Sequence, residues 1–387
     1  MLPRAAAAVL RRLARHYVVI ALTGPRQSGK TTLARSCFPR KPYVSLEDLD
    51  TREFAERDPR GFLAQFRTGA VLDEAQRAPG LFSYLQTLVD RERVPGRFVL
   101  TGSQQFGLFS RISQTLAGRV GFVHLLPFAL SELGPRHAPR SVEELLWRGL
   151  YPPVVAHGIP APTWYADYVA TYVERDVRQL VNVRDLGTFR RFVRMCAART
   201  GQLLNLSSLA SDCGVTHNTA KAWISVLEAS YLVHLLPPYH RNFGKRLIKA
   251  PKLYFVDTGL AAALAGIREP RELAIHPMRG ALFETWVMAE LLKYRLNRGV
   301  PPDLHFWRDS SGLEVDLVVE RGGKLRALEI KAGKTVASDW FAALDRFGRI
   351  TGATSALVFA GDRGQPRSST AVYCWAEVEL AAKRVLG

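Results

Sequence analysis

A phosphate-binding loop near the start of the chain constrains the fold more than any other feature of the sequence. Residues 24–31 read Gly-Pro-Arg-Gln-Ser-Gly-Lys-Thr and match the pattern G-x-x-x-x-G-K-S/T without a mismatch. An apolar run at residues 17–22 precedes the loop, and a helical segment follows it. The motif needs both neighbours, because backbone N–H groups and the positive end of the helix dipole bind the phosphates together. The sequence therefore predicts a nucleotide site in an α/β fold.

The loop and the first turn of the following helix supply the predicted contacts to ATP or GTP. Lys30 would reach the β and γ phosphates, and the hydroxyl of Thr31 would hold Mg²⁺. The alternative is a glycine-containing turn that binds nothing, which the flanking strand and helix disfavour. The expected nucleotide-binding residues are Gly24, Pro25, Arg26, Gln27, Ser28, Gly29, Lys30, Thr31 and Thr32.

Two adjacent acids, Asp73 and Glu74, follow the apolar residues 70–72. Such a run is typical of a buried parallel strand, whose carboxyl end would deliver the two carboxylates to the ligand-binding edge of the sheet. We expect Asp73 to hold the water shell of Mg²⁺. We expect Glu74 to orient or deprotonate the water that attacks the γ-phosphate.

A third apolar strand, residues 98–100, ends in Thr101-Gly102-Ser103. Because the carboxyl ends of parallel strands share one edge of the sheet, Thr101 or Ser103 is expected beside the γ-phosphate as a sensor. The alternative is that these polar residues only form the turn after the strand.

Arg119 precedes the apolar strand expected at residues 120–126. An arginine in this position is a candidate for stabilising the transition state, in its own chain or in a neighbouring subunit of a homo-oligomer. It is equally typical of a surface arginine or of a donor that caps a helix end. The sequence leaves both interpretations open.

Four segments resemble a known family: LTGPRQSGKTTLAR, AVLDEAQRAP, FVLTGSQQF and LAGRV. The chain is similar along essentially its whole length to AAA+ type P-loop ATPases of bacteria and archaea that carry a carboxy-terminal domain of unknown function. The resemblance implies an ATPase core in which Lys30, Thr31, Asp73 and Glu74 have the usual roles. It also implies a helical region after the core, where aromatic residues at 164–173 recur with helical spacing and are expected to pack in the core.

Composition indicates a globular protein of two to three domains, since 387 residues with 47% apolar content can bury a large core. The Ala-rich residues 5–10 are cut short by Arg11 and Arg12, so they are too short for a signal sequence. No apolar run approaches the ~18 residues needed to span a bilayer. The four cysteines are far apart and include no C-x-x-C pair, which argues against a disulfide framework or a zinc site. We expect a cytoplasmic protein with no membrane contact.

The net charge of +18 is concentrated in the first two thirds of the chain. Residues 1–150 carry +9, residues 151–280 carry +7 and residues 281–387 carry +2. Residues 184–252 contain eleven Lys and Arg against three acids, a density that suits contact with a phosphate backbone. DNA is therefore the expected partner of this basic middle segment. The alternative is that an arginine-rich composition makes every surface of the protein basic, without a role in DNA binding.

Two short helices in the same segment are spaced as in a helix-turn-helix. The first is expected at residues 207–213, before Gly214, and the second at 216–230 with Thr216 as its cap. A strand at 232–236 and a basic loop at 241–249 would then form a wing. Ala220, Trp223, Ile224 and Leu227 should face inward, and His217, Thr219, Lys221 and Ser225 outward. Because only Lys221 on that outward face is basic, backbone contact is favoured over base readout, and a protein-docking module or an ATPase lid is the alternative.

A hairpin is predicted in the last third of the chain. Residues 314–320 and 325–331 alternate with period two around Gly322-Gly323, so opposed residues should have numbers that sum to 645. This register opposes Asp316 to Glu329, which would let the two carboxylates bind one divalent cation, with Lys331 on the same side.

Two acids and a lysine on one sheet face resemble the PD-(D/E)xK nuclease core. The resemblance implies that Asp316 and Glu329 bind Mg²⁺ and that Lys331 polarises the scissile phosphate or the attacking water. Glu284, within the apolar helix expected at 282–292, is the candidate for a further metal-binding acid. The chain departs from the family pattern at Glu314, which lies within one residue of the position before the first acid where the family usually has a proline. The alternative is an exposed ladder of ion pairs in which Glu314 and Lys331 solvate one face of the hairpin.

The sequence thus predicts an α/β protein with an AAA+ P-loop NTPase core at 1–127 and a helical lid or linker region at 128–185. A winged-helix-like domain at 186–252 and a restriction-endonuclease-like domain at 253–387 should follow. The expected function is Mg²⁺-dependent ATP hydrolysis coupled to action on DNA, with cleavage by the last domain as an open question. The alternative is a nucleotide-driven switch or scaffold whose inactive nuclease-like domain binds a protein partner.

Overall fold

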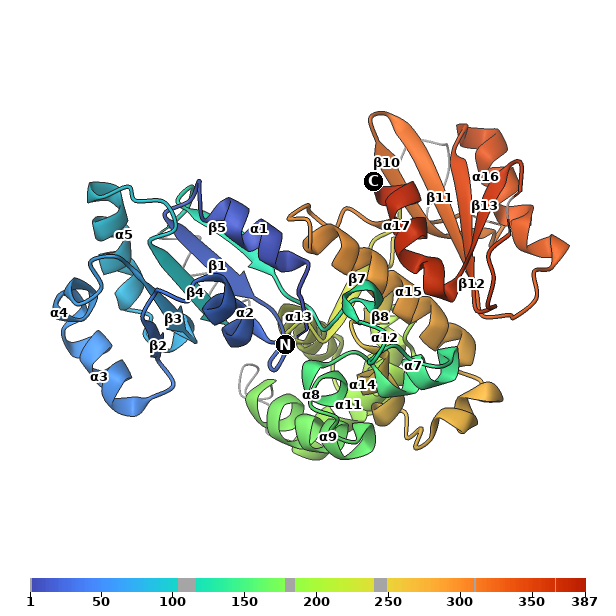
Figure 1. The fold of residues 1–387 in the computed structure, drawn as a ribbon. Helices are drawn as coiled ribbons and strands as arrows, with labels where there is room; N and C mark the ends of the chain where they lie inside the picture. The colour runs from blue at the N-terminus through green and yellow to red at the C-terminus, as the bar shows by residue number, and fades with distance from the viewer. Residues whose placement is uncertain (1, 104–115, 178–184, 240–248, 310, 366) are drawn as a thin grey trace. The chain divides into compact units, whose positions relative to one another are not determined.

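The computed structural model describes residues 2–103, 116–177, 185–239, 249–309, 311–365 and 367–387 (Figure 1). Its contacts divide the chain into two compact units. The first comprises Met1–Phe128 together with Ala229–Tyr231 and Leu296–Pro301, and the second comprises the remaining residues. The helical, middle and carboxy-terminal segments expected after residue 127 therefore lie mainly within one unit.

The first unit is built on a five-stranded parallel sheet of order β2-β3-β4-β1-β5. The apolar runs predicted four of these strands, β1, β3, β4 and β5, but not β2 or the strand order. Its strands are β1 (Val19–Thr23), β2 (Tyr43–Ser45), β3 (Ala70–Asp73), β4 (Phe98–Gly102) and β5 (Val120–His124). Its helices are α1 (Ala6–Leu13), α2 (Lys30–Cys37), α3 (Leu49–Arg57), α4 (Pro59–Ala64) and α5 (Leu81–Arg91).

Successive residues of β1 enter separate cores on the two faces of this sheet, because side chains alternate along a strand. Val19 and Ala21 pack in the core that includes Phe82 of α5, whereas Ile20 and Leu22 pack in the core that includes Leu10 of α1. Helices thus cover both faces (Figure 1). The carboxyl ends of β1, β3 and β4 remain free to carry polar side chains at one edge.

The second unit begins with helices and a small antiparallel sheet of order β6-β8-β7. The buried side chains of Trp164, Tyr165, Tyr168 and Tyr172 confirm the predicted core packing of that aromatic segment. The elements are α7 (Val142–Arg148), α8 (Pro152–Val155), α9 (Ala161–Tyr168), a π-helix (Val169–Val177), α11 (Leu186–Ala198), β6 (Gln202–Leu203), α12 (Leu206–Cys213), α13 (His217–Ala229), β7 (Val233–Leu236), β8 (Lys252–Phe255) and α14 (Thr258–Leu264).

The two helices predicted from turn and cap signals are present as α12 and α13. Gly214 has φ 70° and ends α12, and the Thr216 hydroxyl accepts a hydrogen bond from Thr219 N at 3.2 Å at the start of α13. Ala220, Trp223, Ile224 and Leu227 are buried as predicted. Most of the expected basic wing, residues 240–248, lies outside the described residues.

The second unit ends in a five-stranded mixed sheet of order β13-β12-β11-β10-β9, in which β10 is antiparallel to both of its neighbours. Leu344 and Phe347 of α16 pack on one face of this sheet with Val315 and Ala327. Its elements are α15 (Arg279–Leu296), β9 (His305–Arg308), β10 (Glu314–Arg321), β11 (Lys324–Lys331), α16 (Ala342–Thr351), β12 (Thr354–Phe359), β13 (Thr370–Cys374) and α17 (Val378–Leu386).

None of the helices in the described part of the chain has the length and apolar character that crossing a membrane requires.

Candidate functional site

The phosphate-binding loop connects the carboxyl end of β1 to the start of α2. Gly24 has φ 150°, and a Cβ atom there would lie 2.0 Å from the carbonyl oxygen of Leu125, so this position requires glycine. Lys30 opens α2, and its buried ammonium donates to the carbonyl oxygens of Gly24 at 3.0 Å and Pro25 at 2.9 Å. Burial lowers the pKa of Lys30, while the carboxylates of Glu74 and Asp73 oppose this shift.

The carboxylate of Asp73 is held by three hydroxyl groups at the carboxyl edge of the sheet. Its Oδ2 atom accepts from the Thr31 hydroxyl at 3.0 Å and from the Tyr43 hydroxyl at 2.6 Å. Its Oδ1 atom accepts from the Thr101 hydroxyl. Thr31 and Asp73, the two residues predicted to share Mg²⁺, therefore lie together, and oxygen ligands of this kind fit that ion.

Glu74 lies next to Asp73 in a left-handed backbone conformation, with φ 51°. Its Oε2 atom accepts from the Ser103 hydroxyl at 3.0 Å and from Ser103 N at 3.3 Å. The side-chain amide of Gln76 donates to the same atom. Ser103 and Thr101 thus each hold one of the two acids, which is a role that the sequence-based prediction of a phosphate sensor did not include.

Arg119 does not join this group within its own chain. It precedes β5, which runs parallel to β1 with Val19 opposite Val120 and Thr23 opposite His124. Arg119 therefore lies at the amino edge of the sheet, whereas the phosphate loop leaves the carboxyl edge, ~13 Å away along the strand. Its guanidinium pairs with the Asp90 carboxylate, at 2.9 Å between Nη2 and Oδ2.

Sequence reasoning missed Tyr231, whose side chain belongs to the first unit. The Tyr231 hydroxyl lies 2.7 Å from the Thr23 hydroxyl and 2.9 Å from His124 Nδ1. Burial lowers the pKa of His124 to about 4. This trio fixes the end of β1 immediately before Gly24. Tyr231 comes just after α13, so no local pattern could have assigned it to the sheet.

The hairpin in the second unit has the predicted register. Leu317 pairs with Leu328 and Arg321 pairs with Lys324, as a two-residue turn at Gly322-Gly323 requires. Both glycines have positive φ, 56° and 75°.

Of the candidate nuclease residues, Asp316, Glu329 and Lys331 lie on this hairpin, where the two acids are buried and Lys331 is half-buried, whereas Glu284 lies on α15. Asp316 Oδ2 accepts a hydrogen bond from Ile330 N across the hairpin at 2.8 Å. The Lys331 ammonium pairs with Glu329 Oε1 at 2.6 Å. Burial raises the pKa of Asp316 well above its ordinary value, and the nearby carboxylates of Glu329 and Glu284 raise it further.

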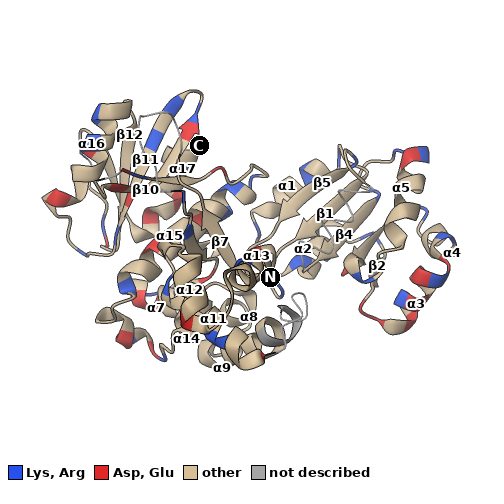
Figure 2. Ribbon diagram, turned by 180° about the vertical axis from the view of Figure 1, so that it is seen from behind, with Lys and Arg blue, Asp and Glu red and all other residues tan. Residues whose placement is uncertain are grey.

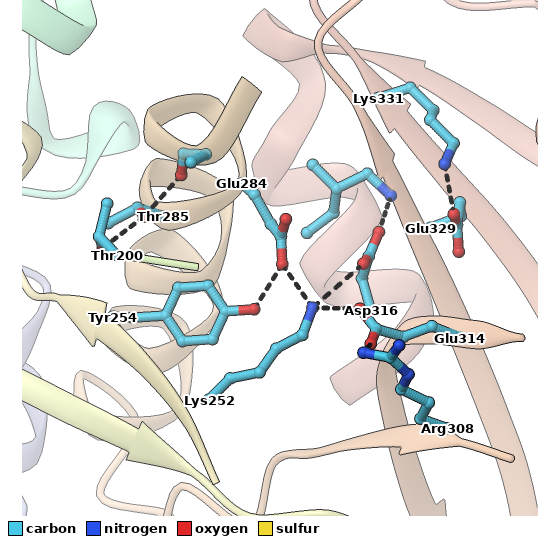
Figure 3. A network of polar contacts seen from close by, with 12 residues as sticks. Thr200, Lys252, Tyr254, Glu284, Thr285, Arg308, Glu314, Asp316, Glu329 and Lys331 are labelled. Atoms are coloured by element: carbon cyan, nitrogen blue, oxygen red, sulfur yellow. Dashed lines mark hydrogen bonds and ion pairs between the residues drawn. The ribbon is translucent and has the colours of Figure 1, made fainter. Parts of the chain in front are cut away.

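A lysine from another element lies among these acids (Figure 3). Lys252, the first residue of β8, places its ammonium 2.9 Å from Glu284 Oε1 and 3.7 Å from Asp316 Oδ1, and it also pairs with Glu314 Oε1. The Tyr254 hydroxyl, two residues further along β8, donates to the same Glu284 oxygen. Burial lowers the pKa of Lys252, but the three carboxylates raise it more, so its pKa lies above the ordinary value.

The structure changes two expectations about this region. Lys252 was counted in the basic segment expected to contact DNA, yet its side chain is only 4% exposed and is paired internally. Glu284, Asp316 and Glu329 were expected to bind one metal ion together, yet no group of three or more such ligands in the described part of the chain is arranged to hold one. The reason is visible in Figure 3: Lys252 lies between Glu284 and Asp316, and Glu329 pairs with Lys331.

The outward face of α13 forms part of the wall of a surface pocket. His217, Lys221 and Ser225 are exposed as predicted, whereas Thr219 is half-buried. The three exposed residues border a pocket of about 650 Å³ together with residues of 203–207 and 249–251. Elsewhere, basic and acidic residues are interspersed, as on α3 and at the end of α5 (Figure 2). Among the residues that line this pocket, Lys221 and Lys249 carry a formal charge, and both are basic.

Residues 16–134 match the family described as "AAA domain". Residues 139–271 and 279–377 match two families described as domains of unknown function, DUF8612 and DUF4143. Two uncharacterized proteins, one from Mycobacterium tuberculosis and one from Mycobacterium bovis, are each 35% identical over 377 residues, which is 95% of this chain and 82% of each relative.

Among solved structures, the Walker-type ATPase of Pyrococcus abyssi is 15% identical with a TM-score of 0.37, covering 67% of this chain and 94% of that one. The RuvB Holliday junction branch migration motor of Thermotoga maritima is 18% identical with a TM-score of 0.27, covering 60% of this chain and 86% of that one. Both TM-scores are below 0.5.

Proposed function

The chain belongs to the family of these two mycobacterial proteins and is an AAA-type P-loop ATPase, and we propose that its ATP hydrolysis is Mg²⁺-dependent and coupled to action on DNA. The observation that carries the first part is the hydrogen bond between Thr31 and Asp73, with Glu74 beside them at the same strand end. Thr31 and Asp73 would hold the ion, which would neutralise charge on the phosphates.

In this proposal each remaining residue acts on the phosphates or on water. Lys30 exchanges its two carbonyl partners for phosphate oxygens, and the backbone of residues 24–32 surrounds them. Glu74 orients or deprotonates the attacking water, while Ser103 holds its carboxylate in place. Arg119 would act on the site of a neighbouring subunit in a homo-oligomer, because it lies at the far edge of its own sheet.

Coupling to DNA is supported by the charge of the first two thirds of the chain and by the order of elements in the middle region. The sequence helix α11, strand β6, helices α12 and α13, then strands β7 and β8 fits a winged helix. We propose that this region contacts the DNA backbone and not base edges, because the outward face of α13 is weakly charged and borders a pocket.

One experiment tests the ATPase and its coupling together. ATP turnover of the full chain is measured with and without duplex DNA at several salt concentrations, beside Lys30→Ala. The proposal expects turnover that needs Mg²⁺, disappears in the variant and rises with DNA at low salt, with the stimulation falling steeply as salt increases. An equal rate of ATP turnover with and without DNA at every salt concentration would contradict the proposed coupling to DNA, but not the proposed ATP hydrolysis.

The carboxy-terminal domain is proposed to have a restriction-endonuclease-like fold. The register of the hairpin supports this, since it puts Asp316 and Glu329 at neighbouring positions with Lys331 close by. A nuclease would nick supercoiled plasmid in Mg²⁺ or Mn²⁺ and lose this activity in Asp316→Ala.

A second candidate function is a nucleotide-driven switch whose carboxy-terminal domain does not cleave DNA and binds a protein partner. The position of Lys252 favours it, because the lysine neutralises acids that a nuclease would need for its metal ion. Plasmid that stays supercoiled with every metal, while DNA still stimulates ATP turnover, would select this candidate.

A further inference from the structure

Lys252 is an unusual residue for its position. It begins β8, whose other residues, Leu253 to Phe255, are all apolar or aromatic and buried. A buried ammonium is costly unless carboxylates compensate for its lost hydration. Lys252 is surrounded by three carboxylates, contributed by α15 and β10, and the Tyr254 hydroxyl orients one of them. Its ammonium thus has the surroundings that proteins normally provide for a bound cation.

The formal charge of the cluster shows what Lys252 replaces. Four carboxylates, Glu284, Glu314, Asp316 and Glu329, face three cationic side chains, Lys252, Lys331 and Arg308, and the last of these lies 3.4 Å from Glu314 Oε2. The formal sum is −1 with Lys252 and −2 without it. One divalent cation would balance the cluster only in the absence of the lysine.

An independent observation indicates that the cluster has unused capacity for a ligand. Glu329 is 4% exposed, and among the described residues its Oε2 atom has no hydrogen-bond partner although the atom itself is buried. Buried carboxylate oxygens are normally paired with a donor or a cation. Removing Lys252 would take the ammonium away from one carboxylate oxygen of each of Glu284, Glu314 and Asp316.

We propose that Lys252 is the resident cation of this acidic cluster and takes the place of a divalent metal ion, so that the carboxy-terminal site is compensated and closed to metal in the form described. The inference rests on the nuclease-like arrangement of acids proposed above, but not on ATP hydrolysis, DNA binding or cleavage. It assigns a role to a residue that comes from the strand before the carboxy-terminal domain. It also explains why the acids meet without forming a metal site.

The test measures Mn²⁺ binding to the full chain without nucleotide or DNA, by electron paramagnetic resonance of free Mn²⁺ and by thermal unfolding with and without Mn²⁺. Lys252→Met, which keeps the length of the side chain without its charge, is expected to gain about one bound Mn²⁺ per chain relative to the unaltered protein and to be stabilised by the ion. Lys252→Arg, which keeps the charge, should gain none. Adding Asp316→Asn to Lys252→Met should abolish the gain.

Mn²⁺ binding to the unaltered protein, compared with Asp316→Asn, gives the result that could contradict the proposal. Mn²⁺ binding by the unaltered chain that disappears in Asp316→Asn would overturn the proposal, because the site would then hold metal beside Lys252. A folded Lys252→Met that gains no Mn²⁺ would overturn it as well. If Lys252→Met folds only when Mn²⁺ is added, the ion has replaced the lysine and the proposal stands. If it does not fold at all, the comparison of the unaltered chain with Asp316→Asn decides. ATP turnover, measured separately with Lys30→Ala, reports on the phosphate loop and is unaffected by any of these outcomes.

Discussion

The hydroxyl of Thr31 donates a hydrogen bond of 3.0 Å to the carboxylate of Asp73. This contact joins the first turn of α2 to the last residue of β3 and brings together the two residues proposed to hold Mg²⁺. Thr101 and Tyr43 hold the same carboxylate from β4 and β2. Neighbouring elements therefore hold the Asp73 carboxylate in a fixed position, and fixed polar groups of this kind are what the proposed electrostatic role in catalysis would use.

Glu74→Gln should separate nucleotide binding from hydrolysis. The amide keeps the shape of the side chain but cannot accept a proton from water, so turnover should fall by about 10²- to 10⁴-fold while ATP binding is retained. Steady-state ATP turnover and binding of a fluorescent ATP analogue measure the two effects. Glu53→Gln, on the exposed face of α3, is the matched control and should change neither. Equal turnover in the two variants would show that Glu74 is not the residue that acts on water.

Gly24→Ala should lose nucleotide binding and stability together. Its Cβ atom would lie 2.0 Å from the carbonyl oxygen of Leu125 at φ 150°, so the loop must move by more than a small adjustment. We expect a loss of ~2 kcal/mol or more in the free energy of unfolding. Gly80→Ala is the matched control, because φ there is −60° and no atom lies within 4 Å of the added carbon. Denaturant unfolding and ATP binding would measure both, and a Gly24→Ala protein that matches the control would contradict the steric argument.

The residues that sequence could predict are those whose neighbours are fixed by short-range geometry. The phosphate loop is continuous in sequence, and parallel strands bring Asp73 and Thr101 to the same edge whatever their separation. The hairpin register followed from its two-residue glycine turn, which leaves one pairing only.

The residues that sequence could not predict reach the sites through long-range packing. Lys252 comes from a strand far from the hairpin acids and was counted with the basic residues of the middle segment. A signal did exist, since period two puts Lys252 and Tyr254 on one face of an otherwise apolar strand. Arg119 is a different case: a residue that precedes a parallel strand lies at the opposite edge from the strand ends that bind ligands, so the direction of the strand alone places it away from the loop.

Arg119→Ala tests whether this arginine acts on a neighbouring subunit. If it does, turnover should fall by ~10³-fold, and the turnover of the unaltered protein per chain should rise with protein concentration as subunits assemble. Asp90→Asn is the control, because it breaks the same ion pair and leaves the guanidinium in place. Similar activity in the two variants, at all concentrations, would reduce Arg119 to a structural partner of Asp90.

The stability of the first unit should fall as the pH falls below neutrality, because of His124. Burial lowers its pKa from the ordinary 6.5 to about 4, where the ring lies against the hydroxyls of Thr23 and Tyr231. Between these pH values the unfolded chain binds a proton that the folded chain does not, so the stabilising contribution is complete above pH 6.5 and is lost as the pH falls through this window. The shift corresponds to ~3 kcal/mol in the free energy of unfolding. His124→Gln should flatten this dependence in denaturant unfolding followed from pH 4 to 7, whereas His157→Gln, at an exposed position, should preserve it. An unchanged slope in His124→Gln would mean that other groups set the acid sensitivity of the sheet edge that carries the phosphate loop.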